Sequence, residues 1–103
     1  MLELPDKSPA VWNKFFKENK FLVYRYILKQ VKTAIEKDLP KIELFKFKDS
    51  GKINMLYEKD YVFALEEALK TFVQMEEYER ANQAKKLIDS YHINLLIKES
   101  NEV

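Results

Sequence analysis

The chain has 103 residues, of which 47% are hydrophobic, 14% are aromatic and 34% are charged, and its formal net charge is +1. This length indicates one domain, and this balance excludes a disordered chain, which lacks the apolar content to build a core. The single glycine and three prolines disfavour an all-β fold, because sandwiches and barrels need many tight turns. Since there is no cysteine, disulfides, thiol nucleophiles and cysteine-based metal sites are excluded.

No run of residues approaches the length of about eighteen apolar residues that a membrane span needs. Residues 1–10 also lack the apolar stretch of a secretion signal, so we expect a cytoplasmic protein. Lysine outnumbers arginine sixteen to two, a bias that is typical of AT-rich coding and indicates a bacterial or phage source.

The charge is distributed unevenly along the chain. Residues 1–52 carry twelve Lys and Arg against seven Asp and Glu, whereas residues 53–103 carry six against ten. Either the two halves neutralise each other within one fold, or the asymmetry steers a partner or a second copy.

A helical region is predicted over residues 8–38. Ser8 followed by Pro9 is typical of a helix start, and the apolar residues that follow recur at helical spacing. Polar residues interrupt this pattern near Asn19, so that either one helix continues through them, with a kink, or a second helix begins there. Residues 1–7 are predicted to form a short extended lead.

Residues 42–57 change to a period of two, which predicts a β-hairpin. Apolar and polar residues alternate on both sides of the turn Asp49-Ser50-Gly51. In the first strand, the inward side chain is either Leu44 or Phe45. A lone hairpin is marginal in water, so this one must pack on the helices or pair with another segment.

Two more helices are predicted at 60–75 and 77–92, and so short a turn joins them that they must be antiparallel. Asp60 is a candidate N-cap for the first of them. Residues 93–97 fit either a strand or a continuing helix, and we expect a short extended segment there. A polar tail follows at 98–103.

Together these elements predict a mainly α (α+β) fold, arranged as a single domain over residues 1–103. Its core is expected to come from the inward faces of the predicted helices: Trp12, Phe16, Val23, Ile27, Val31, Ile35, Leu65, Leu69, Phe72, Ala81, Leu87 and Ile88.

The stretch from Met75 to Ile88, MEEYERANQAKKLI, begins the second helix of this pair. With the residues before it, over 68–88, it resembles the helical-hairpin interaction motif of the UvrB/UvrC family. The resemblance is carried by Glu77-Tyr78-Glu79-Arg80-Ala81, Lys85 and Ile88, and the chain departs from the family pattern at Asn82, Ala84 and Lys86. In that family the motif pairs with another copy of itself through its apolar face, so the resemblance implies docking on a protein. The alternative is that these apolar side chains pack in the core of the chain itself.

This chain lacks the residues that most catalytic mechanisms need. His92 is the only histidine. On a helix Asp89 could orient it for acid–base chemistry, but a histidine near the end of a helix more commonly makes a favourable contact with the helix dipole. The acidic residues lack a cation-binding loop with its turn glycine. We therefore expect no catalytic residue, no metal site and no cofactor.

The sequence thus predicts a non-enzymatic interaction or adaptor protein that docks on a protein partner, most simply on a second copy of itself. The candidate binding residues are Tyr57, Tyr61, Tyr78, Arg80 and Lys85. The alternative is a nucleic-acid-binding regulator, because aromatic and basic residues are interleaved in the first half of the chain. Its candidate residues are Lys14, Lys17, Lys20, Arg25 and Lys29. Helical spacing also allows a plainer arrangement, with the rings inward and the lysines in solvent.

Overall fold

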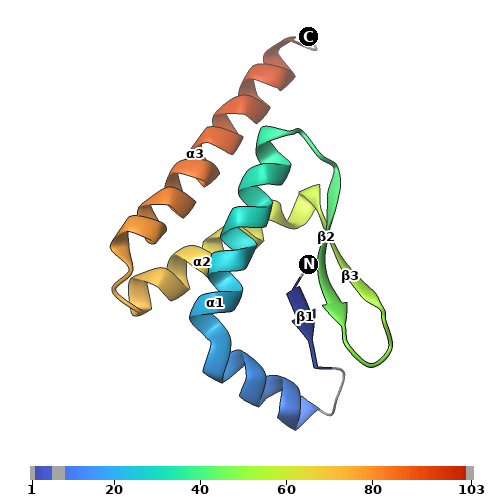
Figure 1. Ribbon diagram of the computed structural model, residues 1–103. Helices are drawn as coiled ribbons and strands as arrows, with labels where there is room; N and C mark the ends of the chain where they lie inside the picture. The colour runs from blue at the N-terminus through green and yellow to red at the C-terminus, as the bar shows by residue number, and fades with distance from the viewer. Residues whose placement is uncertain (1, 6–8, 102–103) are drawn as a thin grey trace.

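The structure is a computed structural model that describes residues 2–5 and 9–101. In chain order the elements are β1 (Leu2–Leu4), α1 (Pro9–Glu36), β2 (Lys41–Phe47), β3 (Ile53–Tyr57), the short 3-10 helix η1 (Glu58–Asp60), α2 (Tyr61–Gln74) and α3 (Tyr78–Asn101) (Figure 1). The predicted fold class, mainly α with a small β component, is confirmed. None of the helices in the described part of the chain is long and apolar enough to cross a membrane.

Helix α1 follows the predicted helical region closely and is kinked. At Asn19 the backbone leaves the helical conformation (φ −120°, ψ 19°), and the Asn19 side chain donates a hydrogen bond to the carbonyl of Phe15 at 2.9 Å. Helix α1 ends where Asp38 takes a positive φ of 53° and the N–H of Leu39 bonds back to the carbonyl of Ala34 at 2.8 Å, a common way to close a helix. The predicted cap at Ser8 lies outside the described residues.

The predicted hairpin is present as β2 and β3, which pair antiparallel. Its turn contains Gly51 at a φ of +71°, a conformation that glycine adopts without steric cost. An irregularity in register between Glu43 and Phe45 turns both Leu44 and Phe45 into the core, where they are 5% and 6% exposed. The sequence left open whether Leu44 or Phe45 points inward, and because of the bulge both of them do.

The hairpin also has a partner strand that the sequence did not predict. Strand β1, within the segment expected to be only an extended lead, pairs parallel with β2 and completes a three-stranded sheet in the order β1-β2-β3. Its Leu4 is 1% exposed. In Figure 1 the sheet lies to one side of the molecule, next to α1, and α2 and α3 lie on the other side of α1.

One hydrophobic core joins the sheet to the helices. Seven of the expected core residues are buried, and the other five, among them Trp12 and Leu69, are partly buried against the core. The residues that the expected list omitted are Leu4, Leu28, Ala34, Leu44, Phe45, Tyr61, Ala68 and Ala84. Most of these come from the sheet or are small residues at close helix contacts.

Helices α2 and α3 form the predicted pair and run in opposite directions (Figure 1). Between them Glu76 has a positive φ of 60°, and the N–H of Glu77 bonds to the carbonyl of Phe72 at 2.7 Å. Asp60 does precede α2, but its side chain makes no capping hydrogen bond. The predicted N-cap interaction is therefore wrong, because η1 leads directly into α2 and supplies the Glu58 carbonyl to the N–H of Tyr61.

The second helix of the pair is longer than expected. The extended segment predicted at residues 93–97 is wrong, because α3 continues without a break to Asn101. There is no glycine or proline between Tyr78 and Asn101 to stop the helix. The alternation that suggested a strand has no neighbouring strand to pair with among the described residues. The first part of the predicted polar tail, up to residue 101, is helical as well.

Candidate functional site

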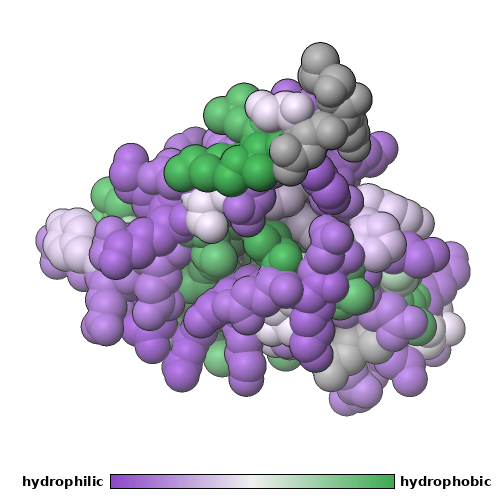
Figure 2. Space-filling model, turned by 90° about the horizontal axis from the view of Figure 1, so that it is seen from above, coloured by the Kyte–Doolittle hydropathy of each residue, from purple (hydrophilic) through white to green (hydrophobic). Residues whose placement is uncertain are grey.

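The C-terminal part of α3 extends beyond the core. Ile88, at 8% exposed, is the last core residue of this helix, and every residue from His92 to Ser100 is exposed. The segment nevertheless carries large aliphatic side chains: Ile93, Leu96 and Ile97 are 56%, 64% and 55% exposed. Figure 1 shows this end of α3 projecting past the other elements, and Figure 2 shows hydrophobic side chains gathered beside the end of the chain.

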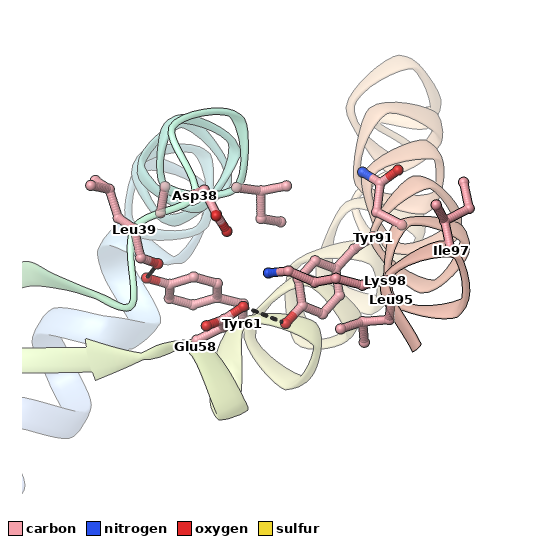
Figure 3. Close-up of a pocket in the computed structure, with 11 residues that line it drawn as sticks. Asp38, Leu39, Glu58, Tyr61, Tyr91, Leu95, Ile97 and Lys98 are labelled. Atoms are coloured by element: carbon pink, nitrogen blue, oxygen red, sulfur yellow. Dashed lines mark hydrogen bonds between the residues drawn. The ribbon is translucent and has the colours of Figure 1, made fainter. Parts of the chain in front are cut away.

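A groove of about 320 Å³ lies at the base of the projecting segment. The end of α1 and the loop after it form one wall with Ile35, Asp38 and Leu39, and α3 forms the other with Tyr91 and Leu95. Glu58 and Tyr61 lie between the two walls (Figure 3). The groove is thus mainly apolar, with two carboxylates and the ammonium of Lys98 at its rim.

Two tyrosines hold the groove together. The Tyr61 hydroxyl donates to the carbonyl of Leu39 at 2.8 Å, and the Tyr91 hydroxyl donates to Oε1 of Glu58 at 3.1 Å (Figure 3). Burial raises the pKa of Tyr61, with the nearby Glu58 charge adding to it. Burial likewise raises the pKa of Tyr91, together with the hydrogen bond to Glu58 and the charges of Glu58 and Asp38. Both phenols are therefore neutral near pH 7, and their O–H groups fix the groove.

A second feature is one exposed side of α3, which lies beside the stripe that packs in the core. Residues 78, 82, 85, 89, 92 and 96 follow one another at intervals of three or four and are all exposed, so they share one side of the helix. We call this side the outer face of α3: Tyr78, Asn82, Lys85, Asp89, His92 and Leu96. It has an apolar residue at each end, Tyr78 at 63% and Leu96 at 64% exposed, with polar and charged residues between them.

The candidate protein-binding residues do not form one cluster. Tyr78 and Lys85 lie together on the outer face of α3. Tyr57 is 48% exposed, but it lies at the end of β3, away from them (Figure 1). Tyr61 was expected to be exposed, and this is wrong: it is 1% exposed because it packs in the core and bonds to Leu39.

Arg80 has a local partner at the start of α3. Its guanidinium lies 3.1 Å from the carboxylate of Glu77 and 5.2 Å from the ring centroid of Phe21 on α1. The contact with Phe21 ties α3 to α1, and with both contacts made Arg80 is only partly available to a partner.

The candidate nucleic-acid residues all point into solvent. Lys14, Lys17, Lys20, Arg25 and Lys29 are exposed along α1, with Lys14 at 4.0 Å from Glu18. The aromatic rings of this region pack against the core instead, which is the plainer of the two expected arrangements. Arg25 and Lys29 also line a second groove of about 310 Å³, together with Lys32 and Arg80.

His92 and Asp89, considered for acid–base chemistry, both lie on the outer face of α3. No group of three or more potential metal ligands occurs among the residues that the structure describes. The features that sequence reasoning missed are the projecting end of α3 and the groove at its base. The projecting end of α3 could have been predicted, because no glycine or proline follows Tyr78 to stop the helix.

No protein family, curated protein or solved structure matches this chain. The resemblance of residues 68–88 to the UvrB/UvrC motif therefore remains an expectation. In the structure Ala81 and Ile88 of that stretch are buried against the core, while Tyr78 and Lys85 are exposed.

Proposed function

We propose that this chain is a small non-enzymatic interaction protein of the cytoplasm, which associates with a second copy of itself through the outer face of α3. The observation that carries the proposal is the projecting end of α3, where Ile93, Leu96 and Ile97 are each more than half exposed. A helix that is apolar on all sides is normally buried, and exposed apolar clusters of this kind mark interaction sites.

The outer face is complementary to itself. If two α3 helices pack antiparallel about a two-fold axis at residue 87, Tyr78 lies opposite Leu96 of the second copy, because 78 and 96 are equally far from 87. In the same way Lys85 lies opposite Asp89, and Asn82 lies opposite His92. Each apolar end thus meets an apolar end, and each charge meets its opposite.

This register concentrates the expected binding energy at its two ends. Ile93 lies beside Leu96 around the helix and enlarges the apolar contact with Tyr78 of the second copy. The Lys85–Asp89 pairs are exposed to solvent and contribute modestly, about 0.2–1 kcal/mol each, but they favour the antiparallel orientation. The spacing of the face is that of helices that pack side by side with interlocking side chains.

Sedimentation equilibrium over a range of concentrations tests the proposal. We expect reversible dimers, and we expect Leu96→Glu to raise the dimer dissociation constant at least about tenfold, which corresponds to about 1.4 kcal/mol. The matched control is Val73→Glu on α2, a position that is 48% exposed and lies outside the outer face. Equal effects of the two substitutions, or an unaltered dimer in Leu96→Glu, would contradict the proposal.

A second candidate function, binding of single-stranded nucleic acid through α1, is favoured by one observation. The exposed Arg25 and Lys29 line one groove with Lys32 and Arg80, against the single acidic residue Glu79, and a groove with this excess of positive charge suits a phosphate backbone. Because the rings of α1 face the core, contacts would be to phosphates and would weaken steeply with salt.

Fluorescence anisotropy with a labelled oligonucleotide at two salt concentrations tests this second candidate function, with Lys29→Glu as the variant and Lys70→Glu on α2 as its control. An absence of binding at low salt would remove this candidate.

A further inference from the structure

Strand β3 is an unprotected edge of the sheet. Among the residues that the structure describes, it pairs only with β2, as the last strand in the order β1-β2-β3. Its sequence from Ile53 to Tyr57, INMLY, contains no charge and no proline, which are the usual devices that keep an edge strand from pairing. Figure 1 shows β3 at the outer border of the sheet, and α2 turns from the end of β3 toward α1, away from that border.

The hydrogen bonds at both ends of β3 show which backbone groups are engaged. The carbonyl of Lys52 accepts from the N–H of Phe47 at 2.8 Å, and the N–H of Glu58 donates to the carbonyl of Pro40 at 2.9 Å. Both of these groups therefore face β2 or the segment that leads into it.

Consecutive residues of a strand turn their backbone groups to opposite edges. Between Lys52 and Glu58, the backbone groups of Asn54 and Leu56 must then also face β2. Those of Ile53, Met55 and Tyr57 face the free edge.

We propose that β3 pairs with β3 of a second copy, antiparallel about a two-fold axis at Met55, so that two three-stranded sheets become one continuous sheet. In this register Met55 lies opposite Met55, and Ile53 lies opposite Tyr57 of the second copy. These are the residues whose backbone groups face the free edge, so each pair can exchange two N–H···O=C bonds. A shift by one residue would bring groups that are already bonded to β2 opposite free ones.

The side chains fit the same register. Ile53 and Tyr57 are 44% and 48% exposed, and an aromatic side chain beside a β-branched one is a favourable cross-strand pair. One residue beyond each end, Lys52 lies opposite Glu58 of the second copy, so that opposite charges close the paired segment on both sides. Glu58 already accepts one hydrogen bond, from Tyr91 at 3.1 Å, and a carboxylate has capacity for more.

This surface is distinct from the outer face of α3, and the inference does not depend on the function proposed above. Each pairing is isologous, using one surface of each copy twice. At the higher concentrations where the β3 pairing also forms, the α3 dimer therefore assembles further, into tetramers or longer arrays.

Amide hydrogen exchange by NMR in the Leu96→Glu background, which removes the α3 contact, tests the β3 pairing residue by residue. Exchange is measured at about 10 μM and at about 1 mM, two concentrations that span weak association. We expect the amides of Ile53, Met55 and Tyr57 to exchange at least tenfold more slowly at the higher concentration. The amides of Asn54 and Leu56, which already face β2, should not change. If the first three amides exchange equally fast at both concentrations, the inference is wrong.

Two variants provide an independent check. Met55→Lys places like charges opposite each other at the two-fold axis and should abolish the concentration dependence. Lys52→Glu places two carboxylates together at each end and should shift the slowed exchange to concentrations that are severalfold higher, because exposed charge pairs contribute modestly. Lys70→Glu, an equal change of charge on the exposed side of α2, should leave it intact. Circular dichroism at low concentration verifies folding, and the Lys52→Glu result decides the matter if Met55→Lys does not fold. An unshifted concentration dependence in Lys52→Glu would also overturn the inference.

Discussion

The two halves of α3 use apolar residues in opposite ways. From Tyr78 to Tyr91, one stripe that includes Ala81, Ala84 and Ile88 is buried, and the other sides are polar. From His92 to Ser100, aliphatic residues occur on several sides of the helix and all of them are exposed. The helix is continuous across the boundary, so its secondary structure does not change there; what ends is the protein surface against which it can pack.

This difference shows why one helix can serve both the fold and an interface. The first half gains its stability from α2 and α1. The second half has about 15 Å of helix with no tertiary support beyond the groove at its base, and a second copy can supply that support. Substitutions on each side of the boundary between Tyr91 and His92 test this difference.

The largest contrast is expected between Ile88→Ala and Leu96→Ala. Ile88 is 8% exposed, whereas Leu96 is 64% exposed. Ile88→Ala leaves a cavity and should lower the free energy of unfolding by about 2–5 kcal/mol. Leu96→Ala should change the stability of the monomer by less than about 0.5 kcal/mol while weakening association. Urea denaturation at low concentration measures the first effect, and sedimentation the second. A Leu96→Ala monomer as unstable as Ile88→Ala would place Leu96 in the core.

A smaller effect is expected at the boundary, where Tyr91 donates to Glu58. Tyr91→Phe removes this bond and should cost about 0.5–1.5 kcal/mol. Because the pKa of Tyr91 is raised in the folded state, its contribution is complete below the unfolded pKa of about 10 and is lost as the pH rises through the folded pKa. The free energy of unfolding should therefore fall above about pH 10.

The alkaline fall should be shallower in Tyr91→Phe than in the original chain. Tyr24 and Tyr61, whose pKa values are raised mainly by burial, should account for what remains. Denaturation at a series of pH values up to about 11 measures both curves. Curves of identical shape would show that Tyr91 is equally ionisable in the folded and unfolded chains.

The smallest effect is expected from the charges of the outer face. Lys85→Asp or Asp89→Lys alone places like charges opposite each other in the proposed α3 pair and should weaken association severalfold, at about 0.2–1 kcal/mol for each pair. The double exchange should restore it. Analytical ultracentrifugation at low salt compares the three variants, and a double exchange no better than the singles would count against the antiparallel register.

Sequence reasoning recovered the elements where the pattern was strong. The hairpin and the α2–α3 pair were predicted, and the interruption near Asn19 was located although a kink and a second helix stayed open there, because periodicity, capping and turn residues act locally. It missed β1, because a three-residue strand has no periodicity until β2 lies beside it. It expected Tyr61 to be exposed because burial of a tyrosine depends on a distant partner, here the carbonyl of Leu39. The continuation of α3 was missed because alternation over 93–97 was weighed above the absence of any helix breaker.

The most direct test of the α3 pairing uses the fact that the chain has no cysteine. Lys85→Cys and Asp89→Cys are prepared separately, mixed above the dimer dissociation constant and oxidised gently, and the disulfide-linked products are quantified by mass spectrometry. In the antiparallel register residue 85 faces residue 89 of the second copy, so the mixed disulfide should form faster than either disulfide between like variants. If the like disulfides form as readily as the mixed one, or if no disulfide forms, the outer face of α3 is not the interface.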